Sequence, residues 1–258
     1  MHLEVPSCID RCGRGSLGPV DSRELNRVLV VTAHPDDVDF GAGGAIAIMA
    51  DKGVKVTYCV VSDGDAGGHD RQAVDVELGR RRRAEQCAAA ACVGVSDVRF
   101  LGYPDGYLVA SLDLRRDIVR VIRDVRPELV ITHTPERNYQ YIPPSHPDHR
   151  AVGGATLDAV YPDARNPYAF PELQSEEGLE AWTVRAVWLF GGMTPNHHVD
   201  ISESFDRKLA ALRAHESQHA HIKGLEGYVR RLYGRWALEV GLPEGHYAEL
   251  FQVVSTIV

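Results

Sequence analysis

The chain has 258 residues, 44% of them hydrophobic and 25% charged, which is typical of a globular protein large enough for one α/β domain. With a formal net charge of −8, the chain as a whole lacks the excess positive charge that is typical of nucleic-acid-binding proteins. No window approaches the roughly 18 consecutive apolar residues of a membrane span. Residues 1–26 contain several glycines that break any regular pattern, so we expect a poorly ordered leader. They lack the apolar central stretch of a secretory signal peptide, so we expect a cytoplasmic protein.

The first predicted strand, Val28–Thr32, is a short run of apolar, mostly β-branched residues, which is typical of a strand buried on both faces. Gly41, Gly43 and Gly44 are expected to turn the backbone into a helix over Ala45–Lys52. The order of strand, polar loop and helix then repeats. Periodicity predicts strands at 54–62, 98–101 and 129–132, and helices at 74–91, at 112–126 and from 149 to about 160. The pattern predicts an α/β fold, a Rossmann-like and mostly parallel sheet flanked by helices.

The second half of this single domain, which we expect to span residues 27–258, is less regular. Residues 161–182 are rich in Pro, Glu and Ser and are interpreted as an insertion or a lid. Strands at 184–190, 198–201 and 250–254 and helices at 204–218 and 225–240 are predicted beyond it. Because side chains alternate along a strand, one of His197 and His198 is a candidate to line a pocket.

Histidines and carboxylates gather at two strand ends. His34, Asp36 and Asp37 follow the first strand, and His146–His149, with the sequence His-Pro-Asp-His, follows the loop after the fourth. In a parallel sheet both loops emerge at the same edge, where ligands usually bind. A catalytic zinc site uses three protein ligands and keeps one position open. His34 and Asp37 can supply two ligands, and a histidine of the second motif can supply the third.

The two motifs, Ala-His-Pro-Asp-Asp at 33–37 and His-Pro-Asp-His at 146–149, resemble those of the LmbE/PIG-L family of zinc-dependent N-acetylglucosaminyl deacetylases. The resemblance is clear from Val28 to Gly154 and looser over Asp200–Gln218. It implies an enzyme that removes an acetyl or other acyl group from a small N-acylated amino sugar or its glycoside. It also implies a Zn²⁺ cofactor, although Fe²⁺ or another divalent ion suits the same ligands, and it leaves a homo-oligomer open.

The same resemblance assigns roles to individual residues. It implies that the metal ligands are His34, Asp37 and His149. It implies that Asp36 is the general base that activates the zinc-bound water. His146 matches the residue that stabilises the oxyanion and assists the leaving amine, and Asp148 matches the carboxylate that orients and charges this histidine.

Two further residues match substrate contacts of the family. Arg82 belongs to an R-x-x-E pattern with Glu85, and the family's arginine lies near the sugar. Most of the Arg80–Arg83 run is nevertheless interpreted as a solvated face, because four consecutive residues point all round a helix. Asp105 matches a carboxylate that binds sugar hydroxyls.

The sequence departs from the common family pattern at two places. Val38 replaces the glutamate that often follows the first motif, although Asp39 is adjacent. Pro144 stands where some members carry a pocket tyrosine, whereas this loop carries Tyr139 and Tyr141.

Three other functions are weighed against the deacetylase. A dinucleotide-binding enzyme could use the glycines at 41–44. The glycine-rich motif of such enzymes begins directly after the strand, however, and here a polar stretch separates the glycines from the strand. A non-catalytic sugar-binding protein would not need Asp36 beside intact metal ligands. An amidase acting on a thiol conjugate, or a deacylase of a glycosylated natural product, remains an alternative within the same family.

Overall fold

The computed structural model describes residues 25–67 and 77–257. The predicted leader therefore lies almost wholly outside the described residues, although Leu25 near its end is buried in the core. Within these ranges, none of the helices combines the length and the apolar character that a membrane span requires.

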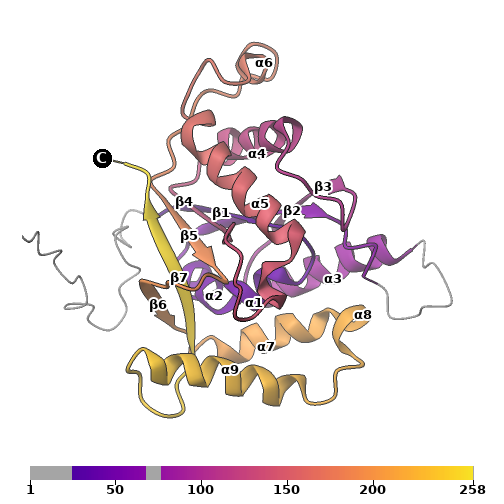
Figure 1. Ribbon diagram of the computed structural model, residues 1–258, viewed down its shortest axis with the longest axis vertical. Helices are drawn as coiled ribbons and strands as arrows, with labels where there is room; N and C mark the ends of the chain where they lie inside the picture. Colours follow the sequence, from indigo (N-terminus) through magenta and orange to yellow (C-terminus); the bar gives the residue numbers. More distant parts are fainter. Residues whose placement is uncertain (1–24, 68–76, 258) are drawn as a thin grey trace, which may run out of the picture.

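The described residues form a seven-stranded sheet in the order β3-β2-β1-β4-β5-β7-β6 (Figure 1). Its strands are β1 (Arg27–Thr32), β2 (Lys55–Ser62), β3 (Asp97–Tyr103), β4 (Leu129–His133), β5 (Ala186–Phe190), β6 (His197–Asp200) and β7 (Ala248–Ser255). Strands β1 to β5 pair in parallel, whereas β7 is antiparallel to both β5 and β6. The predicted Rossmann-like, mostly parallel sheet is confirmed.

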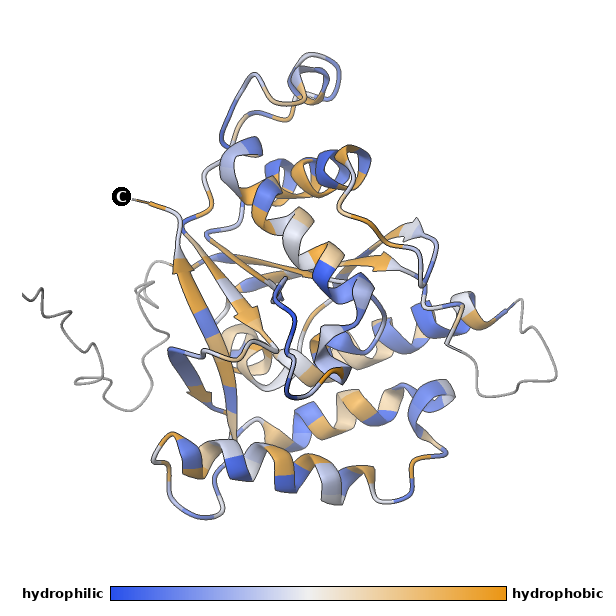
Figure 2. Ribbon diagram, viewed as in Figure 1, coloured by the Kyte–Doolittle hydropathy of each residue, from blue (hydrophilic) through white to orange (hydrophobic). Residues whose placement is uncertain are grey.

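Helices cover both faces of the sheet (Figure 1). They are α1 (Asp37–Gly41), α2 (Gly43–Asp51), α3 (Leu78–Cys92), α4 (Leu112–Val125), α5 (Pro147–Asp158), α6 (Pro171–Ser175), α7 (Phe205–Ala214), α8 (Glu216–His219) and α9 (Leu225–Glu239), with a 3₁₀ turn η2 (Pro143–Ser145) and a π-helical turn η3 (Ala159–Asp163). In β1, Leu29 and Val31 pack toward α4 and α5, whereas Val28 and Val30 pack toward α2, α3, α7 and α9. Both faces of β1 are therefore buried as predicted, and Figure 2 shows hydrophobic residues along the central strands.

The chain enters its first helices earlier than predicted. Helix α1 begins at Asp37, and Gly44 lies inside α2 rather than before it. These glycines permit close packing: a Cβ on Gly44 would lie 2.7 Å from the Ile201 side chain, and one on Gly41 would lie 2.5 Å from the Phe190 ring. Their role is set by contacts with distant strands and loops, which the local pattern does not contain.

The segment 161–182 packs against the amino ends of the strands. Trp182 donates from Nε1 to the carbonyl of Pro127, just before β4, and the guanidinium of Arg27, at the start of β1, lies over the Trp182 ring. The buried guanidinium of Arg123 donates to several backbone carbonyls of the segment. The polar motifs follow the opposite, carboxyl ends, so this segment is not placed as a lid over them.

A buried ion pair joins α7 to β7 beneath the start of α2. Nζ of Lys208 lies 2.7 Å from Oε1 of Glu249, and both side chains are fully buried. The Glu249 carboxylate also accepts hydrogen bonds from the backbone N–H groups of Gly44 at 2.9 Å and Ala45 at 2.8 Å. These N–H groups open α2 and have no partner within the helix, so Glu249 both satisfies them and balances the buried ammonium.

We expect Lys208→Met to lower the free energy of unfolding by about 3 to 5 kcal/mol, because it leaves the buried Glu249 charge without its counter-ion. Urea unfolding at neutral pH measures this loss. Arg235→Met is the matched control, because its pair with Glu239 is exposed and should contribute less than about 1 kcal/mol. Equal effects of the two substitutions would contradict the importance of the buried pair.

Candidate metal centre at the carboxyl ends of the strands

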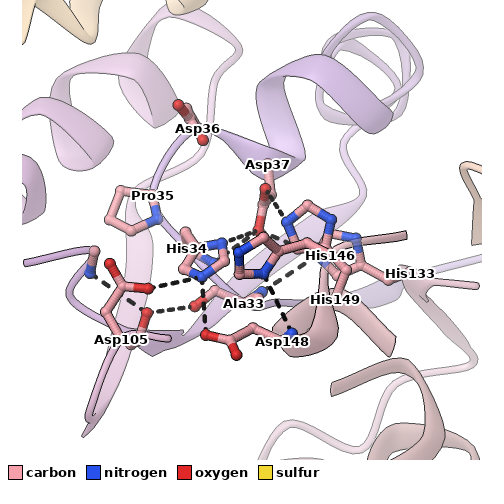
Figure 3. A network of polar contacts seen from close by, with 12 residues as sticks. Ala33, His34, Pro35, Asp36, Asp37, Asp105, His133, His146, Asp148 and His149 are labelled. Carbon is pink, nitrogen blue, oxygen red and sulfur yellow. Dashed lines mark hydrogen bonds and ion pairs between the residues drawn. The ribbon is translucent and has the colours of Figure 1, made fainter. Parts of the chain in front are cut away.

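Polar side chains from three strand ends converge at one edge of the sheet (Figure 3). Strand β1 leads into His34 and Asp37, β3 leads into Asp105, and β4 ends at His133. The start of α5 adds His146–His149. These strands are parallel, so their carboxyl ends lie at the same edge. The two motif loops therefore lie together in space.

The Asp37 carboxylate links the three residues predicted as metal ligands. Its Oδ1 lies 3.0 Å from Nε2 of His149, and its Oδ2 lies 3.4 Å from Nδ1 of His34. Among the described residues, potential ligand atoms within 4.8 Å of one another form three groups: His34, His146 and His149; Asp37, His133 and His149; and His34, Asp105 and Asp148. The three predicted ligands are thus pairwise neighbours, and two more histidines adjoin them.

His133 belongs to this cluster although the sequence did not single it out. Its Nε2 lies 3.2 Å from Oδ2 of Asp37 and accepts a hydrogen bond from the Ala33 N–H. Its ring stacks on that of His149, with 4.2 Å between centroids. Burial, together with the charge of His149, lowers the pKa of His133 to about 4, so its imidazole is neutral. Its position directly after the fourth predicted strand was the one available signal.

The other nitrogen of His34 faces two carboxylates. Nε2 of His34 lies 3.0 Å from Oδ1 of Asp105 and 3.2 Å from Oδ2 of Asp148. Burial alone would lower the pKa of His34, but hydrogen bonds to Asp105, Asp148 and Asp37 raise it to about 12. Asp105, predicted to contact the sugar, is itself buried and also accepts a hydrogen bond from the Ala66 N–H. Three buried carboxylates around one imidazole favour a cation at this point, which is the proton on Nδ1 of His34 or a metal ion that replaces this proton.

The carboxylate of Asp148 does not contact the imidazole of His146, which corrects the predicted pairing. It accepts hydrogen bonds from the N–H groups of Gly106 at 2.8 Å and Leu108 at 3.3 Å, in addition to its contact with His34. The Asp148 N–H instead donates to Nδ1 of His146 at the start of α5. Burial and neighbouring charged histidines lower the pKa of His146, and Asp148 offsets this only in part. The Asp148 carboxylate therefore contacts His34 rather than His146, and its role in keeping His146 charged stays a prediction.

Asp36 lies apart from the cluster (Figure 3). Its φ is 91°, and its Oδ2 lies 3.2 Å from Nε2 of His219 and 3.6 Å from Nη2 of Arg82. Arg82 is only 4% exposed, and it donates to the carbonyls of Gly64 at 2.8 Å and Pro35 at 2.7 Å. Arg82 thus joins the loops after β1 and β2 behind Asp36, so this member of the arginine run does not lie on a solvated face.

A family model described as PIG-L, GlcNAc-PI de-N-acetylase, matches residues 29–160. The chain belongs to the PIG-L family. This confirms the resemblance that the two motifs indicated.

Individual PIG-L relatives match over most of the chain. A diacetylchitobiose deacetylase from Thermococcus kodakarensis is 34% identical over 238 residues, which cover 91% of this chain and 85% of the relative. A probable N-acetyl-α-D-glucosaminyl L-malate deacetylase from Bacillus cereus is 36% identical over 209 residues, which cover 76% and 89%. The solved structure of N,N′-diacetylchitobiose deacetylase from Pyrococcus horikoshii has a TM-score of 0.81 at 30% identity and covers 90% of this chain and 85% of that one. These matches confirm the fold.

A close contact between α5 and β4 sets the relative position of the two PIG-L motifs. A Cβ on Gly153 would lie 2.4 Å from the carbonyl oxygen of His133, so only glycine fits at this contact without movement of the backbone. Gly153 lies on the helix that carries His149, one turn further along. The glycine therefore lets α5 bring His149 against Asp37.

The other histidine candidates lie elsewhere in this PIG-L fold. His197 and His198 belong to β6, the edge strand beyond β7. The His197 ring packs against Trp188 with 4.8 Å between centroids, and burial lowers its pKa to about 4. Across the described part of the chain, the contacts of these histidines do not include the cluster around Asp37. The expectation that one of them lines the pocket gains no support.

Proposed function

We propose that this protein is a metal-dependent hydrolase that removes an acetyl group from a small N-acetylated amino sugar or its glycoside. The observation that carries the proposal is the Asp37 carboxylate, which lies 3.4 Å from Nδ1 of His34 and 3.0 Å from Nε2 of His149. This cluster stands at the sheet edge where ligands bind in such folds. The PIG-L match and the names of the deacetylase relatives support the substrate class.

His34, Asp37 and His149 would hold the metal ion. Two imidazoles and one carboxylate form a donor set that suits Zn²⁺ and also Fe²⁺. The surroundings fit a cation, because the carboxylates of Asp105 and Asp148 add negative charge on the far side of His34. When bound, such an ion lowers the pKa of water toward about 7 and polarises a carbonyl group.

Asp36 and His146 would move the protons. Asp36 directly precedes the ligand Asp37 but is not itself a candidate ligand, and its described contacts engage only Oδ2, so Oδ1 is assigned to take a proton from the attacking water. His146 is exposed, and its Nδ1 accepts the N–H of Asp148. The proton of a neutral His146 therefore resides on Nε2, from which it can be donated to the oxyanion that develops on the substrate. Stabilisation of this oxyanion thus does not require the charged form of His146.

Asp148→Asn should weaken metal binding about 10- to 100-fold, because Asp148 orients His34 through Nε2 and such outer partners tune metal affinity. Competition with a chromogenic chelator measures this affinity. Asp124→Asn, which removes an exposed carboxylate paired with Arg99, should leave it unchanged. Unchanged metal affinity in Asp148→Asn would contradict the role of Asp148 in orienting His34.

A substrate panel tests the proposed function. Release of free amine should be measured with N-acetylglucosamine, diacetylchitobiose and simple N-acetylglucosaminides, and in parallel with N-acylated thiol conjugates. Turnover of the amino sugars supports the proposal, whereas turnover of the thiol conjugates alone would favour the amidase. Sugar binding without amine release from a metal-loaded protein would favour a non-catalytic sugar-binding protein.

A further inference from the structure

A histidine from a distant part of the chain holds Asp36. Oδ2 of Asp36 lies 3.2 Å from Nε2 of His219 and 3.6 Å from Nη2 of Arg82. His219 is the last residue of α8 and is only 7% exposed. Both contacts described for the carboxylate engage the same oxygen, so they constrain its orientation while leaving Oδ1 for another partner.

The surroundings of His219 determine where its protons lie. Nδ1 is 2.8 Å from the carbonyl oxygen of Leu212, which can only accept, so Nδ1 carries a proton. Nε2 must also carry a proton if it is to donate to Oδ2 of Asp36, which lies 3.2 Å away. Burial lowers the pKa of His219, but the hydrogen bonds to Asp36 and Leu212 outweigh it and raise the pKa overall. The imidazolium form therefore satisfies both neighbours.

Helix α3 fixes both members of this pair. The carboxylate of Glu85 accepts hydrogen bonds from the N–H of Ser217 at 2.8 Å and from its hydroxyl at 2.6 Å, which anchors α8. One residue further along α3, Oε1 of Gln86 accepts the N–H of Asp36 at 2.9 Å. His219 and Asp36 are thus held against the same helix.

We propose that His219 is a positioning residue for the deacetylation, in which its Nε2–H holds Oδ2 of Asp36 and leaves Oδ1 to take the proton of the attacking water. The inference rests on the proposed function, because it requires Asp36 to act as the base. Asp36 sits at a positive φ in the turn before α1, where the helix itself does not fix its side chain. Without His219, the longer contact with Arg82 would be the remaining described restraint on the carboxylate.

Kinetics of two variants test the role of His219. His219→Ala should lower kcat about 10- to 100-fold, the usual effect of removing a partner that orients a functional group, with metal content unchanged. KM should stay within about threefold, because His219 acts through Asp36 rather than through the substrate. The amide N–H of His219→Gln can still donate to Asp36, so this variant should recover most of the lost kcat.

His246→Ala is the matched control. His246 also pairs with a carboxylate, Asp200 at 2.8 Å, but this pair is partly exposed and lies outside the cluster. Its loss should leave kcat unchanged. A wild-type kcat in His219→Ala, an effect confined to KM, or a folded His219→Gln no better than His219→Ala would each overturn the proposal.

A second measurement does not depend on activity. Nitrogen-correlated NMR at pH 7 should show protons on both ring nitrogens of His219. The two signals are assigned by their loss in His219→Gln. Asp36→Ala should remove the Nε2 signal and leave the Nδ1 signal. A singly protonated His219 in the wild type would overturn the proposal.

If both protons are present but no N-acetylated sugar is turned over, the proposed function fails. If sugars are turned over and His219→Ala keeps full kcat, only the role of His219 fails.

Discussion

We expect Asp37→Ala to lose the bound metal ion and, with it, all measurable amide hydrolysis. The carboxylate of Asp37 contacts His34, His133 and His149, so its removal leaves these imidazoles without a shared anionic neighbour. Burial raises the pKa of Asp37, but the adjacent His149 and His133 lower it well below its usual range, so the group is ionised at neutral pH. A site with three protein ligands has little redundancy, so one lost ligand should release the ion.

Elemental analysis after dialysis, together with kcat in the presence of added zinc, measures both losses. Asp65→Ala is the control, because this exposed carboxylate follows β2 at the same sheet edge but is not among the candidate ligands. It should keep the metal content and kcat of the wild type. A folded Asp37→Ala protein that retained about one ion per chain would show that the metal is held elsewhere.

The second large effect is expected from Asp36→Ala, which should keep the metal and lower kcat about 100- to 10,000-fold, the usual contribution of a general base. Asp36 is not in the candidate ligand groups, so its loss spares the ion and removes the proton acceptor. Asp36→Asn should be equally impaired, because the amide keeps the size of the side chain but cannot accept the proton of the water.

Single-turnover measurements on metal-loaded protein separate this loss from slow product release. The result that would contradict the account is near-normal turnover by metal-loaded Asp36→Asn. In that case another carboxylate or histidine of the cluster would have to act as the base.

The sheet was predictable wherever the hydrophobic pattern decides the structure. The run Val28–Thr32 is buried on both faces, because a central strand under two helical layers must be apolar on both sides. The antiparallel direction of β7 was not predictable, because an apolar run carries no direction. The start of α1 was missed for a related reason: Gly41 and Gly44 resemble turn residues, but they serve contacts with Phe190 and Ile201 that arise only in the folded chain.

The candidate site was predictable to the extent that its residues adjoin one another in the sequence. The two motifs identified the neighbours of Asp37 because each motif follows a strand or opens a helix at the same edge. His133 and His219 belong to neither motif, and only the fold brings them to Asp37 and Asp36. The partner of Asp148 was mispredicted because the backbone N–H groups of the loop after β3 and the ring of His34 compete for its oxygens.

The most direct test of the account is a paired measurement of acetate and free amine from diacetylchitobiose. The wild-type protein should release them in equal amounts, lose this activity on chelation, and regain it when Zn²⁺ or Fe²⁺ is restored. Metal-loaded Asp36→Ala should release neither at a comparable rate. Equal release of acetate and amine by thoroughly chelated protein would contradict the proposal that the cluster of His34, Asp37 and His149 holds a metal ion on which amide cleavage depends.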